Sequence, residues 1–248
     1  MTIAYDIGGD GPVVLLLHAG VCDRRMWNDQ WQPLIDAGFQ VIRCDLRGYG
    51  QSPLPAEPYS DCEDVLALLD GLSIDRASLV GGSYGGKVAL RVAASRPERV
   101  ESLVLLAAAL PGREQSAELR ALEEREEALI EAGDLAGGAR LMAESWLGPD
   151  AGEDAHQAVR EMQLRAYELQ SADGLAGPVE TEVDPADIKM PCLAVSGAYD
   201  LADFRQPEAV LPAARHVELP WAGHLPNMER PAEVTELIIS FLRETLHE

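Results

Sequence analysis

Residues 81–86, Gly-Gly-Ser-Tyr-Gly-Gly, have the types and spacing needed for nucleophilic catalysis. They follow an apolar run at 77–80 and precede a helix-like pattern at 87–95. In a G-x-S-x-G turn the serine lies at a sharp corner between a strand and a helix, and small neighbours let the two elements approach closely. The pattern predicts a nucleophile elbow, in which the Ser83 hydroxyl is exposed and the Tyr84 N–H stabilises negative charge at the positive end of a helix.

A serine hydroxyl is a weak nucleophile at neutral pH, so it requires a general base and a group that orients the base. Among the five histidines, His224 is the one in a loop directly after a predicted strand, with small and turn-forming neighbours. Asp200 follows the predicted strand 192–196, where an orienting acid would project, and Asp203 is the competing acid. The predicted triad, in chain order, is Ser83, Asp200 and His224.

A second N–H donor for an oxyanion is expected from Gly20, just after the predicted strand 13–17. His18 lies at the end of that strand and is expected to brace a loop through hydrogen bonds rather than to act in catalysis. The segment 45–52, Asp-Leu-Arg-Gly-Tyr-Gly-Gln-Ser, is also expected to be structural, as a tight glycine-rich turn held by Asp and Arg. Gly20 and Tyr84 are therefore the two predicted oxyanion donors.

These residues need a sheet to position them, and short apolar runs alternate with helix-like patterns along the chain. This alternation is typical of an α/β fold with a mostly parallel, doubly wound sheet flanked by helices. Ser60 and Glu63 have capping-box spacing at the start of a helix expected over 60–72, and Pro231 begins the last helix. Strands are predicted at 13–17, 40–43, 77–81, 100–106, 192–196 and 215–219.

The alternation stops between residues 111 and about 185, where Ala, Glu, Leu and Arg dominate and no strand-like run occurs. From 112 to 184 there are 18 acidic residues and six arginines, which account for 12 of the protein's 22 net negative charges. Apolar residues recur among the charged ones, which favours amphipathic helices over disorder. We expect this insert, residues 111–185, to form a helical lid over the site. The alternative is a solvated helical hairpin with no role there.

The net charge of −22, with only two lysines, argues against nucleic acid or an anionic membrane surface as a partner, because both need a basic surface. The four cysteines are widely spaced and form no C-x-x-C pair, which indicates buried thiols rather than a zinc site or a redox pair. Near residue 1 there is no signal-like or membrane-spanning apolar run, so a cytoplasmic location is expected. The oligomeric state is not defined by the sequence.

Together these motifs resemble those of the α/β-hydrolase family, over the whole chain except the insert. The matching residues are the H-x-G at 18–20, the D-x-R-G-x-G-x-S at 45–52, the elbow at 81–85, Asp200, and the Gly-His at 223–224. The resemblance implies a core formed by residues 1–110 and 186–248, with the variable helical lid, 111–185, inserted after the sixth strand. Ala19 replaces a glycine that is common in the family, while the backbone donor that follows is retained.

The segment 23–27, Asp-Arg-Arg-Met-Trp, with Gln30, resembles a D-x-R-M-W segment of enol-lactonase-like and related esterase members. Epoxide hydrolases and dehalogenases use an aspartate nucleophile and are disfavoured, since Ser83 occupies the elbow. The expected activity is hydrolysis of a carboxylic ester or lactone through an acyl-enzyme, without a cofactor or metal. Alternatives with the same triad are a C–C bond hydrolase and a cofactor-free perhydrolase of the haloperoxidase type. A non-catalytic small-molecule receptor is the alternative from another class.

The acidic insert also favours a neutral substrate, because nearby negative charge repels an anion. A carboxylate-bearing substrate would need an arginine clamp. Each arginine near the expected site is more often a surface or packing residue than a clamp; the candidates are Arg24, Arg25, Arg140, Arg160 and Arg165.

Overall fold

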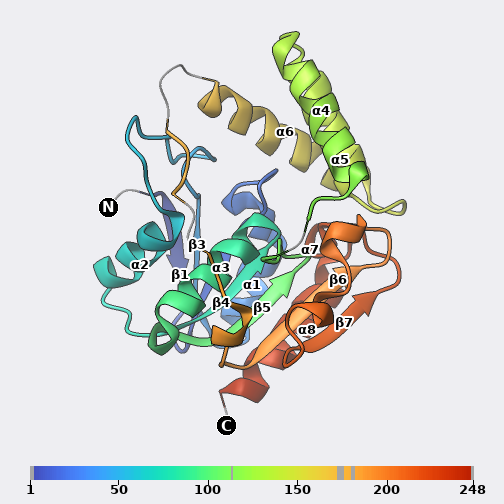
Figure 1. Ribbon diagram of the computed structural model, residues 1–248. Helices are drawn as coiled ribbons and strands as arrows, with labels where there is room; N and C mark the ends of the chain where they lie inside the picture. The colour runs from blue at the N-terminus through green and yellow to red at the C-terminus, as the bar shows by residue number, and fades with distance from the viewer. Residues whose placement is uncertain (1–2, 113, 172–175, 180–181, 247–248) are drawn as a thin grey trace.

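A computed structural model describes residues 3–112, 114–171, 176–179 and 182–246. Its centre is a seven-stranded sheet with the order β1-β3-β2-β4-β5-β6-β7 (Figure 1). β1 pairs antiparallel with β3, and all other neighbouring strands run parallel, so the predicted α/β class with a mostly parallel sheet is confirmed. The strands are β1 (Tyr5–Gly8), β2 (Val13–Leu17), β3 (Gln40–Cys44), β4 (Ala77–Gly82), β5 (Val100–Leu106), β6 (Cys192–Gly197) and β7 (Arg215–Leu219).

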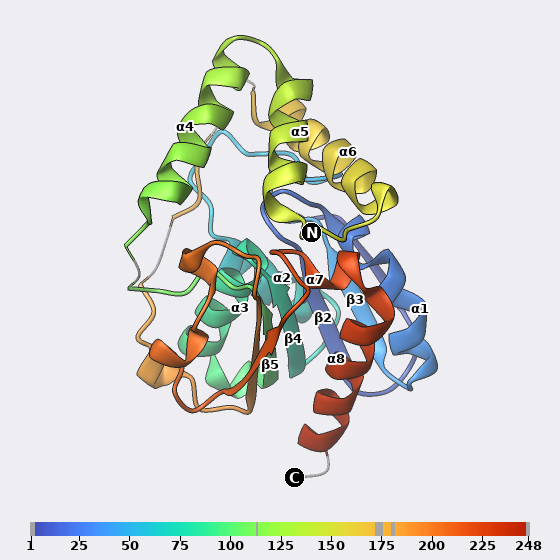
Figure 2. The same ribbon diagram turned by 90° about the vertical axis from the view of Figure 1, so that its right-hand side faces the viewer.

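Helices cover both faces of this sheet (Figure 2). Val14 and Leu16 of β2 pack in the layer that contains α1 and α8. Leu15 and Leu17, which point to the opposite face, pack in the layer that contains α2 and α3. Burial on both faces explains why the strands occur in the sequence as continuous apolar runs.

The predicted starts of two helices are confirmed. Ser60 is the N-cap of α2, and its Oγ accepts a hydrogen bond from the Glu63 N–H at 3.4 Å. Pro231 is the first residue of α8. The α-helices are α1 (Asn28–Asp36), α2 (Asp61–Gly71), α3 (Tyr84–Ser95), α4 (Ala117–Glu131), α5 (Leu135–Trp146), α6 (Glu153–Gln170), α7 (Pro226–Glu229) and α8 (Pro231–Thr245), and short 3₁₀ helices span Arg24–Trp27, Pro97–Arg99, Pro185–Asp187, Ala202–Phe204 and Pro207–Ala209. In the described ranges, no helix combines the length and the apolar character needed to cross a membrane.

Two features of the sheet differ from the sequence prediction. Tyr5–Gly8 forms the edge strand β1, which the sequence analysis missed because the segment is short, partly polar and only half buried. The helices of the insert follow β5, the fifth strand, and not a sixth strand as predicted. The reason is that, in the described part of the chain, a single strand precedes Val13–Leu17.

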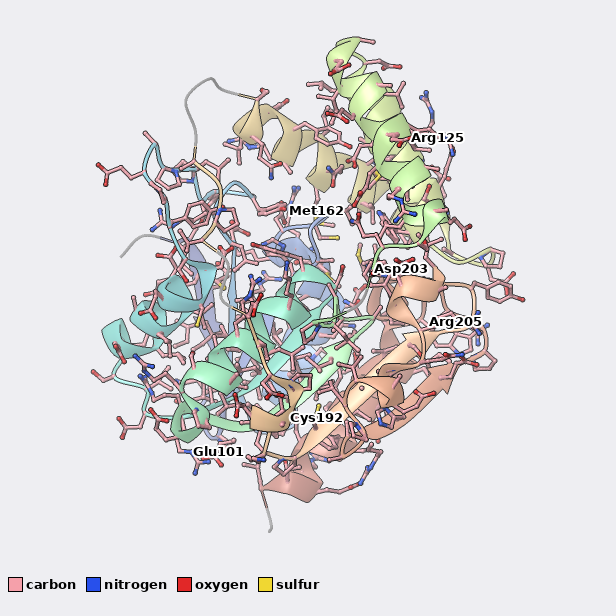
Figure 3. The ribbon with its side chains drawn as sticks, viewed as in Figure 1. Glu101, Arg125, Met162, Cys192, Asp203 and Arg205 are labelled. Carbon is pink, nitrogen blue, oxygen red and sulfur yellow. The ribbon has the colours of Figure 1, made fainter. Side chains whose placement is uncertain are left out.

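Helices α4, α5 and α6 lie together beyond the carboxyl end of the parallel strands (Figures 1 and 2). As predicted, the described residues of the insert form helices and no strand. Figure 3 places Met162 of α6 and Asp203 of the loop after β6 at this end of the sheet, whereas Glu101 and Cys192, at the starts of β5 and β6, lie at the opposite end. The loops that follow β2, β4, β6 and β7 therefore face these three helices.

The four cysteines, Cys22, Cys44, Cys62 and Cys192, are free and buried, as predicted. Burial raises the pKa of the Cys22 and Cys44 thiols above their ordinary value. These thiols are therefore protonated packing groups at neutral pH.

Candidate active site

Ser83 lies at the corner where β4 ends and α3 begins. Its φ of 48° and ψ of −112° are unusual for a residue with a side chain, so the backbone here is strained. A Cβ atom at Gly81 would lie 2.5 Å from the Gly85 oxygen, and one at Gly85 would lie 2.3 Å from the Leu17 oxygen. Glycine is needed at both positions, in agreement with the predicted close approach of strand and helix.

Three backbone hydrogen bonds hold this strained corner. The Ser83 N–H donates to the Leu106 oxygen, at the end of β5, at 2.9 Å. The Ser83 carbonyl oxygen accepts from the Lys87 N–H at 3.1 Å and from the Ala109 N–H at 3.2 Å. The surroundings on both sides therefore fix the Ser83 backbone, which is the condition under which strain persists in a folded protein.

Asp200 and His224 lie together after β6 and β7. The Nδ1 atom of His224 is 2.8 Å from Oδ2 of Asp200, and both residues are buried. The competing acid, Asp203, instead accepts a hydrogen bond at 2.7 Å from the N–H of Ser116, the N-cap of α4. With Nδ1–H donating to the Asp200 carboxylate, Nε2 is the nitrogen of His224 that can accept a proton.

Two aromatic side chains that the sequence analysis did not assign to the site lie against His224. The Trp146 ring centroid is 4.4 Å from that of the imidazole, and the Phe204 ring centroid is 4.3 Å from it. The His224 N–H also donates to the Trp146 carbonyl oxygen at 2.8 Å. In the sequence, both aromatic residues resemble ordinary core residues, because nothing in the pattern indicates that α5 ends beside the loop after β7.

The backbone just before His224 passes close to the insert. A Cβ atom at Gly223 would lie 2.6 Å from the Gly148 nitrogen, so these two segments of the chain touch through their backbones. The Glu229 carboxylate of α7 accepts the Gly223 N–H at 3.0 and 3.1 Å. Burial raises the pKa of Glu229, while the N–H groups that bond to it oppose this shift. The loop that carries His224 is thus held by both the insert and α7.

The two predicted oxyanion donors are neighbours. A Cβ atom at Gly20 would be 3.6 Å from Cβ of Tyr84. The Tyr84 hydroxyl donates to Oδ2 of Asp61 at 2.5 Å, which anchors the Tyr84 side chain to the start of α2. The Ala19 carbonyl oxygen accepts the Cys22 N–H at 2.9 Å, and Ala19 has no positive φ. Alanine at position 19 therefore closes this turn without backbone strain.

His18 braces the loop that carries Gly20, as predicted. Its Nε2 atom accepts a hydrogen bond from the Leu46 N–H at 3.0 Å, and its Nδ1 atom lies 2.8 Å from the Ala19 oxygen. Burial lowers the pKa of His18, which agrees with a neutral ring that donates through Nδ1 and accepts at Nε2. His18 therefore links this loop to the segment 45–52.

The segment 45–52 is a turn held by Asp45, as expected. The Asp45 carboxylate accepts the Arg24 N–H at 2.8 Å and also pairs with the Arg24 guanidinium. The arginine that holds the turn therefore comes from outside it, because Arg47 pairs with Asp64 of α2 instead.

Ser83 and His224 line the same cavity, which has a volume of about 510 Å³ and also has Gly20 in its wall. Helices α4, α5 and α6 supply most of the other side chains. They include Glu126 and Ile130 of α4, Met142 and Trp146 of α5, and Gln163 and Tyr167 of α6. Ser83 also borders a second cavity of about 330 Å³, which has Tyr84, Lys87 and Phe204 in its wall. Trp146 lies in the walls of both cavities.

Among the described residues, no arginine or lysine lines the larger cavity. Arg140 is exposed on α5. The other four candidate clamp arginines form ion pairs elsewhere: Arg24 with Asp6 and Asp45, Arg25 with Asp23, Arg160 with Glu153, and Arg165 with Glu168. The structure therefore brings none of the five to the cavity wall.

The fold is that of the Alpha/beta hydrolase family, whose sequence profile matches residues 14–237, and the chain belongs to this family. It is similar to the solved enol-lactonase from Burkholderia xenovorans LB400, at 28% identity and a TM-score of 0.79, over 97% of this chain and 96% of that chain. It is also similar to a thermophilic esterase from Thermogutta terrifontis, at 27% identity and a TM-score of 0.79, over 98% of this chain and 93% of that chain.

A curated relative from Pseudomonas putida is named as the dihydrolipoyllysine-residue acetyltransferase component of an acetoin cleaving system. It is 31% identical over an alignment of 262 positions, which covers 97% of this chain and 66% of that protein. The chain thus spans just under two thirds of the length of this relative.

Proposed function

We propose that the protein is a serine hydrolase that cleaves a neutral carboxylic ester or lactone through an acyl-enzyme. The observation that carries this proposal is that Ser83, at a strained strand-to-helix corner, and His224, bonded to Asp200 at 2.8 Å, line one cavity. Similarity to solved structures named as an enol-lactonase and an esterase supports the same reaction class.

In this mechanism the Ser83 hydroxyl attacks the ester carbonyl carbon while Nε2 of His224 takes its proton. Asp200 holds the ring and stabilises the imidazolium. The N–H groups of Gly20 and Tyr84 stabilise the oxyanion of the tetrahedral intermediate. His224 then gives the proton to the leaving alcohol, and a water molecule, activated by the same ring, hydrolyses the acyl-enzyme.

Two further observations support cleavage of an ester between two organic parts. Ser83 borders two cavities, of about 510 and 330 Å³, so an acyl part and an alcohol part can lie on different sides of it. The insert, residues 111–185, acts in this proposal as a lid over the core formed by 1–110 and 186–248, because α4, α5 and α6 line the larger cavity.

The test is labelling by a fluorophosphonate probe together with turnover of a neutral aryl ester and a simple lactone. Ser83→Ala should lose the label and about a millionfold in kcat. Ser240→Ala, on the exposed face of α8, is the matched control and should behave as wild type. Turnover by Ser83→Ala within tenfold of wild type would disprove the proposal.

The same assays separate the alternatives. A non-catalytic receptor would bind esters without releasing an alcohol. A C–C bond hydrolase would cleave a β-diketone faster than any ester in the set. A perhydrolase would form a peracid from a carboxylic acid and hydrogen peroxide faster than it hydrolyses the esters.

A further inference from the structure

The larger cavity has a polar wall opposite the proposed nucleophile that the reaction itself does not use. The side chains of this wall come from α4 and α6: Glu126, Gln163 and Tyr167. Gln163 is only 4% exposed. A buried amide needs hydrogen-bond partners, so what this group bonds to is informative about a ligand.

In this polar wall one strong acceptor, Gln163 Oε1, lacks a hydrogen-bond donor among the described residues. The Tyr167 hydroxyl donates its proton to Oε1 of Glu126 at 2.5 Å. Gln163 lies in the same wall, and its side chain opposes the rise in the pKa of Tyr167, as an amide does when its N–H is turned towards a hydroxyl oxygen. With Nε2 turned towards Tyr167, Gln163 Oε1 remains as a buried acceptor that has no hydrogen-bond partner among the residues that the structure describes.

Two other polar groups of the cavity wall differ from Gln163 Oε1. Gln170 Nε2 donates to the Gly48 oxygen at 3.2 Å, and Trp146 Nε1 is a buried donor that has no partner among the described residues and so needs an acceptor. An acceptor without a donor has a free-energy cost when buried, because it has lost its hydrogen bonds to water. A ligand that brings a donor to Gln163 removes that cost, and one that brings only a methyl group does not.

The charge of the wall limits which ligand groups can lie beside Gln163. Glu126 is an acid, and no arginine or lysine lines the cavity in the described ranges. A carboxylate on the ligand would face this acid without a counter-ion. The donor that fits is therefore one without negative charge, such as a hydroxyl or an amide N–H.

We infer that the cavity selects esters or lactones that carry a hydrogen-bond donor without negative charge, away from the scissile bond, which binds Gln163 Oε1. This inference rests on the proposed function, because it concerns the substrate of the same site. Gln163 is a specificity residue in this view: it contacts the substrate but takes no part in bond breaking.

The test uses matched esters in which a methyl group replaces a terminal hydroxyl. One series varies the acyl part, with methyl ω-hydroxyalkanoates against methyl alkanoates from butanoate to octanoate. The other varies the alcohol part, with ω-hydroxyalkyl acetates against alkyl acetates. In at least one series, wild type should prefer the hydroxyl compound by about tenfold or more in kcat/KM.

Gln163→Met, which keeps the volume and removes the acceptor, should reduce this preference to less than about threefold. Gln157→Met is the matched control, since Gln157 is exposed on the same helix, and it should keep the preference. Thermal melting checks that both variants are folded.

Three results would overturn the inference: equal kcat/KM for both members of every pair, an unchanged preference in Gln163→Met, or a tenfold advantage for a half-ester with a terminal carboxylate. Each of these requires that esters are hydrolysed. If no ester is turned over, the proposed function fails instead, so the two failures are distinguishable.

Discussion

The sheet and the helical insert contribute differently to the larger cavity. The carboxyl end of the sheet contributes Ser83, His224 and Gly20, and backbone hydrogen bonds or close backbone contacts fix the first two. The helices α4, α5 and α6 contribute side chains such as Ile130 and Gln163.

This difference suggests a division of roles. Groups that must form a precise geometry lie on the rigid sheet, where small displacements are prevented. Groups that only need to match the size and polarity of a substrate lie on the helices. If the division holds, substitutions at the sheet end should change kcat or stability, and substitutions on the helices should change the ranking of substrates.

After the loss expected for Ser83→Ala, the largest effect is expected at the acid. Asp200→Asn should lower kcat by about 10⁴, because an amide does not enforce the required tautomer of His224 or stabilise the imidazolium. Asp203→Asn is the matched control: its amide oxygen can still accept the Ser116 N–H, so kcat should stay within about threefold of wild type. Steady-state kinetics on one neutral ester give both values, and the reverse ranking would assign the acid to Asp203.

A large loss of stability is expected at the corner. The new Cβ atom in Gly85→Ala would lie 2.3 Å from the Leu17 oxygen, so β2 and α3 would have to separate. We expect a loss of about 3 kcal/mol or more in the free energy of unfolding. Gly177→Ala, where no atom lies within 4 Å of the added Cβ, should change it by less than about 0.5 kcal/mol. Chemical denaturation measures both, and similar values for the two variants would contradict a tightly packed corner.

On the helices, a smaller and selective effect is expected. Ile130→Ala removes part of the cavity wall and should favour longer esters, with a gain of about fourfold in relative kcat/KM for each added methylene that fills the space. The change in kcat should be less than about tenfold. Glu127→Ala, on the exposed side of the same helix, should leave the ranking unchanged. An equal loss of kcat/KM for esters of every chain length would contradict the division of roles between the sheet and the helices.

The smallest effect concerns stability and pH. Burial raises the pKa of Glu126, with a further contribution from Glu123, and the bond from Tyr167 opposes the shift. Since the folded protein holds this proton more tightly than the unfolded chain, wild type should lose stability relative to Glu126→Gln as pH rises from the ordinary Glu range towards the raised pKa. We expect a difference of at most a few degrees in Tm between pH 4 and 8. Parallel melting curves of both proteins check it, and a difference of the opposite sign would mean that Glu126 is stabilised as a carboxylate.

The same difference between sheet and helices explains how much the sequence could predict. Ser83, Asp200 and His224 follow strands directly, so their place along the chain was enough to predict that they share one edge of a parallel sheet. The 45–52 turn was recognised from its glycines, but its arginine partner was not, because Arg24 reaches it from another part of the chain.

The groups contributed by the helices could not be predicted. Trp146 and Gln163 have no signature in the sequence, since an aromatic or amide residue on an amphipathic helix fits many packings equally well. Their relation to the site depends on how α4, α5 and α6 are oriented over the sheet. The short strand Tyr5–Gly8 was missed for a different reason: an edge strand needs few apolar residues.

Besides the contact of the Trp146 ring, main-chain atoms link His224 to the insert: the His224 N–H bonds to the Trp146 carbonyl oxygen, and Gly223 touches Gly148. A main-chain link does not depend on which side chains the helices carry. Substitutions across α4, α5 and α6 can therefore accumulate over generations while the histidine keeps its place. A protein built in this way can acquire a new substrate through single inherited substitutions on the helices, while the residues at the carboxyl end of the sheet stay in place.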